Sequence, residues 1–171
     1  VRWNEARLLP RFVPASTPTG SGQWTSDYKE SVRVATTAAL PAYTRTGDVI
    51  TANANGALPT VDSVSLTVGT RRIMFWHGAS GSDNGTYDVT QLGDGGTPFI
   101  LTRTVDGDGN TETFTDGARV SIGEGTLYGG RTFKLTTNDP ITLNVTSLVF
   151  ALDTGLADGT ATGQVPRWDG T

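Results

Sequence analysis

Residues 84–103 read NGTYDVTQLGDGGTPFILTR and carry the pattern that decides the fold. Tyr87 and Val89 alternate with polar neighbours, which places apolar side chains on one face of a strand. Phe99-Ile100-Leu101 is a continuous apolar run. The Asn-Gly pair at the start and Asp94-Gly95-Gly96 in the middle supply the positive φ that tight turns require. The stretch therefore predicts short strands joined by tight turns.

The same two patterns recur outward from this stretch. Alternating apolar residues indicate half-buried strands at Val64–Val68, Ala118–Ile122, Phe133–Leu135 and Ile141–Val145. Continuous apolar runs indicate strands covered on both faces at Ile73–Trp76, Phe99–Leu101 and Leu148–Leu152. Further turn sequences are Asn55-Gly56, Asp106–Gly109 and Asn138-Asp139-Pro140, and helical periodicity is confined to candidates such as Val34–Leu40. We predict an all-β fold, an antiparallel β-sandwich or barrel-like domain.

Three segments differ in composition. Residues 1–30 are predicted to form an extended proline-rich arm, since Pro10, Pro14 and Pro18 recur every four residues among Ser, Thr and Gly. Residues 31–152 form the predicted sandwich domain. Residues 153–171 are a flexible Gly/Thr/Asp linker with a terminal segment. Removal of residues 1–30 is therefore expected to leave a folded domain.

The arm and the terminal segment carry more aromatic side chains than solvated segments usually do. Trp3, Phe12 and Trp24 lie in the arm, and Trp168 lies in the terminal segment. These four residues are candidates for anchoring the chain on a neighbouring subunit. The alternative is that the arm aromatics pack on the core of their own chain.

The composition excludes several classes of protein. A length of 171 residues with 36% hydrophobic and 18% charged residues suits one domain with a small core and extensions. The net charge of -4, with only two lysines, offers little to neutralise nucleic-acid phosphates. No stretch approaches the ~18 apolar residues that a membrane span needs. The chain has no cysteine, so disulfides and cysteine-ligated zinc are excluded. We expect neither a nucleic-acid nor a membrane partner.

Few residues indicate catalysis. The single histidine is His77, and the nucleophile-elbow pattern Gly-x-Ser-x-Gly fails after it because Ser82 stands where the second Gly is needed. Glu112, Asp116 and Glu124 could in principle flank a sugar, but sequence spacing alone cannot place two carboxylates across one. We therefore expect a protein that is not an enzyme, with no catalytic residues and no cofactor.

One loop sequence points to a cation or ligand site. Asp106, Asp108 and Asn110 alternate like the first ligands of a calcium loop, but Thr111 and Gly117 stand where an EF-hand needs Gly and Glu. A looser oxygen-ligand site stays open beside the alternative of a hairpin turn with hydrated carboxylates. These three residues, with Trp76 and His77, are also candidate ligand contacts, although Trp76 could equally fill a core.

Six turn-and-strand phrases occur in a recognisable order. They are residues 32–43 (VRVATTAALPAY), 49–52 with 55–59 (VITA and NGALP), 68–69 (VG), 83–90 (DNGTYDVT), 97–103 (TPFILTR) and 135–143 (LTTNDPITL). Together they resemble a domain that recurs in tail-fibre-like and other virion-associated proteins of tailed bacteriophages and prophages. The sequence departs from that resemblance at residues 71–77 (RRIMFWH), which are more apolar than the polar segment of similar chains. This departure suggests a contact specific to this assembly.

The resemblance implies a structural or adhesion module of a virion with no family catalytic residues. We expect a non-enzymatic component of a tail fibre, a head fibre or a capsid-decorating spike, assembled in the bacterial cytoplasm and exposed on the particle. Its partners would be itself, as a homotrimer, and other virion proteins. The alternative is a fibre-tip module that binds a host surface glycan through the loops around residues 78–85 and 106–112.

Overall fold

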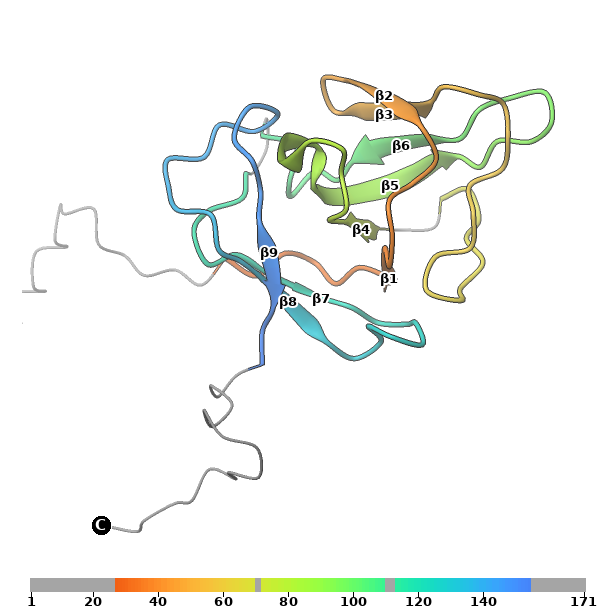
Figure 1. Cartoon of the computed structure of the whole chain (residues 1–171). Coiled ribbons are helices and arrows are strands. Elements are labelled where there is room, and N and C mark those ends of the chain that lie inside the picture. The colour runs from red at the N-terminus through yellow and green to blue at the C-terminus, as the bar shows by residue number, and fades with distance from the viewer. Residues whose placement is uncertain (1–26, 70–71, 110–112, 155–171) are drawn as a thin grey trace, which may run out of the picture.

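The computed structural model describes residues 27–69, 72–109 and 113–154 and confirms the all-β prediction. A six-stranded sheet has the order β1-β4-β5-β6-β3-β2, and a three-stranded antiparallel sheet has the order β7-β8-β9 (Figure 1). The strands are β1 Val34–Ala35, β2 Tyr43–Thr46, β3 Val49–Ala52, β4 Ile73–Phe75, β5 Gly85–Gln91, β6 Ile100–Arg103, β7 Arg119–Ser121, β8 Thr132–Leu135 and β9 Phe150–Leu152. The only helical element among these residues is a 3₁₀ turn at Gly81–Asp83.

The β5–β6 hairpin forms as the opening stretch predicts. Tyr87 lies opposite Arg103 and Val89 opposite Leu101, and the register shifts between Val89 and Gln91. In the turn, the Asp94 carboxylate accepts hydrogen bonds from the backbone N–H groups of Gly96 and Thr97. These bonds lower the pKa of Asp94, because they favour the charged carboxylate.

Strand β4 separates two hydrophobic cores. Ile73 and Phe75 point into the first core, while Met74 points into the second, and all three are completely buried. The first core lies between the six-stranded sheet and the loop that contains Leu58. The second core lies between β1 and β4 on one side and the three-stranded sheet on the other. The prediction that β4 is covered on both faces is therefore confirmed.

Residues 27–35 join the two sheets. Tyr28 and Val32 pair in parallel with Arg119 and Ile122 beside β7, and β1 then pairs in parallel with β4. The six-stranded sheet is thus mixed and not purely antiparallel. Lys29, which the sequence assigns to the arm, is buried in the folded part and donates its N–H to the carbonyl of Arg119. Folded structure therefore begins before residue 31.

Two strand predictions are wrong, and the helix candidate does not form a helix. Val64–Val68 contributes only an isolated bridge between Val61 and Val64. Residues 141–145 form a turn in which Thr142 accepts from the N–H groups of residues 145 and 146, and Asn144 adopts a φ of 67°. The helix candidate at residues 34–40 begins as β1. Local side-chain and turn hydrogen bonds replace the regular structure that the apolar spacing predicts.

Strand β9 is also less buried than its apolar run predicts. Phe150 is buried, whereas Val149 is 54% exposed and Ala151 is exposed. The three-stranded sheet has its second core on one face only, so alternate residues of β9 face solvent. By contrast, β7 and β8 have the alternating burial that the sequence predicts.

Candidate functional site

Trp76 and His77 lie directly after β4. Trp76 is half-buried, its Nε1 donates to the carbonyl of Thr36 at 2.7 Å, and its ring lies 4.8 Å from that of Phe133. His77 Nδ1 lies 3.2 Å from Thr36 Oγ1. Burial lowers the pKa of His77, and a hydrogen bond with the backbone of Thr36 offsets only part of this effect. Both residues thus help to attach the end of β4 to the segment after β1.

The predicted loop ligand Asp106 is used inside the fold. Its Oδ2 accepts from Arg72 Nη1 at 2.6 Å and from the N–H of Glu30 at 2.9 Å. Burial by itself would raise the pKa of Asp106, but hydrogen bonds from Thr104, Glu30 and Arg72 outweigh it and lower the pKa. The carboxylate holds residues 30, 72 and 106 together and is not presented to solvent as a loop ligand.

Of the other two members of the predicted cation loop, the structure describes only Asp108. Asp108 lines a hollow of about 390 Å³ together with Asp48, Thr113 and Asn144. Asn110 lies outside the described residues. Within residues 27–69, 72–109 and 113–154, no group of three or more histidine or acidic side chains is placed to hold a metal ion.

The four predicted anchoring aromatics, Trp3, Phe12, Trp24 and Trp168, also lie outside the described residues. The structure describes only part of residues 71–77, the segment at which the sequence departs from the resemblance. Ile73, Met74 and Phe75 are buried within the chain itself. Their apolar character is therefore explained by two intramolecular cores and needs no contact with another subunit.

The loop at residues 78–85 is held by an arginine that sequence spacing does not single out. Arg45 of β2 forms an ion pair with Asp83 and donates to the carbonyl of Asn144 at 3.0 Å. Tyr43 Oη also donates to Asp83, at 2.8 Å. Burial raises the pKa of Tyr43 to about 12, a shift that the backbone N–H of Ala79 reduces and Asp83 increases. These partners are 36 to 99 residues apart in the chain, so no local motif could reveal them.

A second arginine completes this network. Arg103 of β6 donates to the carbonyls of Ser82 and Asn84 at 2.8 and 2.9 Å and to Asn144 Oδ1 at 3.0 Å. Its guanidinium carbon lies 4.9 Å from the ring centre of Tyr87. Asn144 therefore ties the loop between β8 and β9 to β2 and β6. The polar groups of the loop at residues 78–85 therefore hold the fold together. We look for a binding surface elsewhere on the described chain.

The most distinctive surface is formed by residues 36–42 and 53–60, which we call the uncharged face. No Asp, Glu, Lys, Arg or His occurs between residues 34 and 44 or between residues 49 and 61. Many side chains of this face are nevertheless exposed: Thr37, Ala38, Ala39, Pro41, Ala42, Asn53, Ala54, Asn55, Ala57, Pro59 and Thr60. Charged residues make up 18% of the chain, so an exposed surface that contains none differs from the rest of the protein surface.

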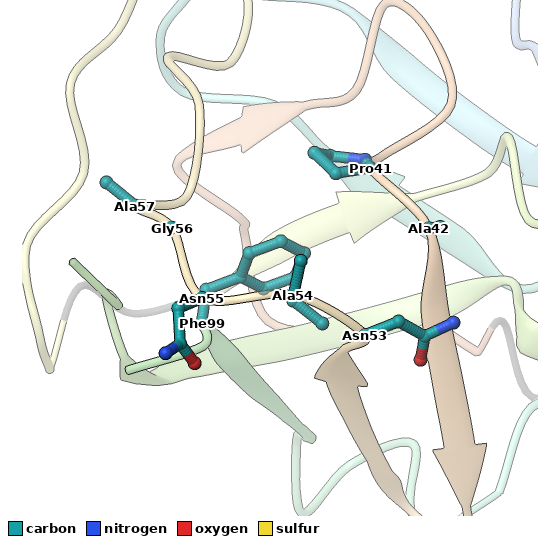
Figure 2. Close-up of a pocket in the computed structure, with 9 residues that line it drawn as sticks. Pro41, Ala42, Asn53, Ala54, Asn55, Gly56, Ala57 and Phe99 are labelled. Carbon is teal, nitrogen blue, oxygen red and sulfur yellow. The ribbon is translucent and has the colours of Figure 1, made fainter. Parts of the chain in front are cut away.

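Two shallow hollows that share Pro41 lie on the uncharged face. The larger, of about 330 Å³, is lined by Pro41, Ala42, residues 52–57 and Phe99. Figure 2 shows the Phe99 ring between Pro41 and the chain at Ala54 and Asn55. The smaller, of about 160 Å³, lies between residues 36–41 and residues 59–61. Next to the larger hollow, the N–H of Gly56 donates to Thr97 of the β5–β6 turn.

The loop order positions these hollows on the six-stranded sheet. Residues 36–42 connect β1 to β2, and residues 53–60 continue from β3, so the β2–β3 pairing brings both segments to one end of the sheet (Figure 1). The N–H of Asn53 donates to the carbonyl of Ala42 and closes this end. Prolines at positions 41 and 59 remove backbone donors from the surface and favour extended chain.

Comparisons with known proteins give no similar protein: no protein-family model, curated protein or solved structure matches this chain significantly. In the described part of the chain, no helix has the length and apolar character to cross a membrane. A proposal of function therefore has to rest on the residues and geometry of the chain itself.

Proposed function

We propose that the chain is a non-enzymatic structural component of a phage or phage-like virion, part of a tail fibre, a head fibre or a capsid-decorating spike. The observation that carries this proposal is the exposed, uncharged face with its two apolar hollows. Cores of protein interfaces are depleted in charged residues, while the remaining surface of a soluble protein keeps them. Self-association as a homotrimer, together with contacts to other virion proteins, would cover this face.

The order of the turn-and-strand phrases supports the virion assignment. The internal use of ionisable groups supports a structural role. Arg45, Arg72 and Arg103 bind carboxylates or carbonyls that hold loops to strands. Such groups stabilise the domain and do not converge on a substrate. The particle would then be assembled in the bacterial cytoplasm and expose this domain on its surface.

The mass of the purified full chain in solution tests the proposal. Light scattering should give about three times the 18.0 kDa mass of the single chain. The substitution Ala57→Glu places a charge on an exposed position of the uncharged face and should lower that mass. Val145→Glu, at a site 75% exposed elsewhere, is the matched control and should not lower it. A monomer at all concentrations would contradict self-association.

Glycan binding is the second candidate, and one observation favours it. Trp76, His77 and Tyr128 are all half-buried, and the Trp76 and Tyr128 rings lie 5.7 Å apart at 77°. Partly exposed aromatic rings can stack on sugars. A glycan array should then show saturable binding that Tyr128→Ala weakens, with folding checked by circular dichroism. No binding on the array would leave the structural role alone.

A further inference from the structure

The described chain begins beside β7, where Asp27 and Tyr28 contact Arg119, and ends just after β9. Figure 1 shows β7 and β8 at the bottom of the view and the β2–β3 pair, whose ends carry the uncharged face, at the top. Asp27 is fixed at its position, because its carbonyl accepts from Arg119 and its carboxylate accepts from Thr115. The arm is therefore attached to the domain beside β7, in the sheet that does not carry the hollows.

One segment of the arm matches the uncharged face in chemistry. Residues 13–25, VPASTPTGSGQWT, contain no charged side chain, whereas residues 1–12 contain Arg2, Glu5, Arg7 and Arg11. Burying a segment without charges against an uncharged surface costs less free energy than burying a charged one, which would leave ions unpaired. Trp24 in this segment belongs to the residue type that most often dominates binding energy in interfaces.

We propose that residues 13–25 of one copy bind the uncharged face of a second copy, with Trp24 in the larger hollow. The inference rests on the self-association proposed above and names the surfaces that make it. The indole would contact the exposed side chains of Pro41 and Ala54, above the buried ring of Phe99. Pro14 and Pro18 favour an extended backbone, whose carbonyl groups need hydrogen-bond donors. The side-chain amide of Asn55 at the rim of the hollow can donate to them.

The attachment point of the arm favours an occupant from a second copy. Trp24 is three residues from Asp27, so its backbone lies within about 11 Å of Asp27 at full extension. The hollow lies at the end of the β2–β3 pair in the six-stranded sheet, whereas Asp27 is held against Arg119 of β7 in the other sheet. Binding between an arm at one side and a hollow at the other is a head-to-tail contact, which closes into a ring when the rotation between copies permits. A closed ring of three is the homotrimer proposed above.

Cysteine cross-linking of the full chain tests this contact, because the chain has no cysteine of its own. One protein carries Gln23→Cys and the other Ala57→Cys. After mixing and mild oxidation, a non-reducing gel should show a disulfide-linked dimer, and peptide mapping should join residues 23 and 57. The matched control pairs Gln23→Cys with Val145→Cys, whose site is exposed and lies outside the uncharged face. It should give at least tenfold less product.

The outcomes separate this inference from the proposed function. A trimeric mass without the link between residues 23 and 57 overturns the arm contact and leaves self-association standing. A monomeric mass overturns both. A chain that carries both Gln23→Cys and Ala57→Cys and forms only the intramolecular disulfide also overturns the inference. Selective linkage of Ala57→Cys to Gln164→Cys in the terminal segment overturns it too. Specific linkage between copies, lost on Trp24→Ala, supports it.

Discussion

At the residue scale, two glycines with similar backbone angles differ in what surrounds them. Gly93 has a φ of 73° and Gly47 a φ of 57°, both in the left-handed region. A Cβ on Gly93 would collide with the carbonyl oxygen of Gly56 and lie 2.5 Å from the nitrogen of Phe99, whereas nothing lies within 4 Å of one on Gly47. Gly93 is therefore required for close backbone approach as well as for its φ.

We expect Gly47→Ala to lower the free energy of unfolding by about 1 kcal/mol, because only the strain of the left-handed conformation is added. Gly93→Ala should cost about 3 kcal/mol or more, because backbone atoms of the 53–57 loop and of residue 99 must move. Urea denaturation of both variants measures the difference. Equal costs would show that the two loops can separate without penalty.

Asp106 gives a prediction about pH. Its folded-state pKa lies below the ordinary value, so the carboxylate contributes its full stability above the unfolded-state pKa of about 3.9 and loses it as the pH falls through the folded-state pKa. Asp106→Asn should cost about 1.5–3 kcal/mol at pH 7, where it leaves Arg72 with only the exposed Glu30 as an ion-pair partner. The cost should shrink below about pH 4. Unfolding curves at several pH values measure it, and a cost independent of pH would contradict this account.

Sequence reasoning performs unevenly at this scale. It identifies Tyr87 and Val89 as buried because alternation depends only on neighbours. It places Asp106 in a loop site because it cannot see Arg72, which is 34 residues away. The lack of charge at residues 34–44 and 49–61 is visible in the sequence, but only the β2–β3 pairing shows that the two stretches form one surface.

At the element scale, the segment of residues 27–35 is more important than its short strand suggests. Lys29 donates its Nζ to the carbonyl of Thr113 at 2.6 Å and pairs with Asp27 at 2.9 Å. Asp27 accepts from both the N–H and the hydroxyl of Thr115 at 3.0 Å. The segment thus fastens the three-stranded sheet to the rest of the domain through several buried or half-buried contacts.

Two truncations separate the arm from this segment. A chain lacking residues 1–26 keeps every contact of residues 27–35 described above and, without the proposed arm contact, is the reference for the domain alone. A chain lacking residues 1–30 should lose on the order of 3 kcal/mol or more, since each lost hydrogen bond contributes about 1 kcal/mol. Thermal unfolding measures both. Equal stability of the two truncations would restore the boundary at residue 30 that composition alone predicts.

Element prediction succeeds where turn chemistry and alternation agree. The β5–β6 hairpin and strands β7 and β8 have both signals. Residues 141–145 have the alternation, but Asn144 and the threonines around it form a turn instead. Parallel pairing of residues 28–35 carries no local signal, because its partners in β7 and β4 are far along the chain. Long-range pairing is therefore the part of the fold that composition and spacing cannot supply.

At the scale of the whole molecule, the uncharged face predicts how association depends on salt. Contacts between uncharged groups are not screened by ions, whereas interactions between exposed charges fade within a Debye length of about 3 Å at 1 M salt. The trimeric mass should therefore persist in 1 M sodium chloride. Light scattering at 0.05 and 1 M salt checks this, and dissociation at high salt would point to ion pairs outside the uncharged face.

The parallel segment beside β7 also has a mechanical consequence. Residues 28–32 and β9 both run parallel to β7, with antiparallel β8 between β7 and β9. Tension applied outward at residues 27 and 154 therefore pulls the segment beside β7 and strand β9 in opposite directions along their lengths. Their hydrogen bonds would be loaded together in shear and would not break one at a time, so forced unfolding should be slow. Single-molecule pulling at these two points would measure the unfolding rate. In the fibre or spike proposed above, this arrangement would slow the unfolding of the domain under load.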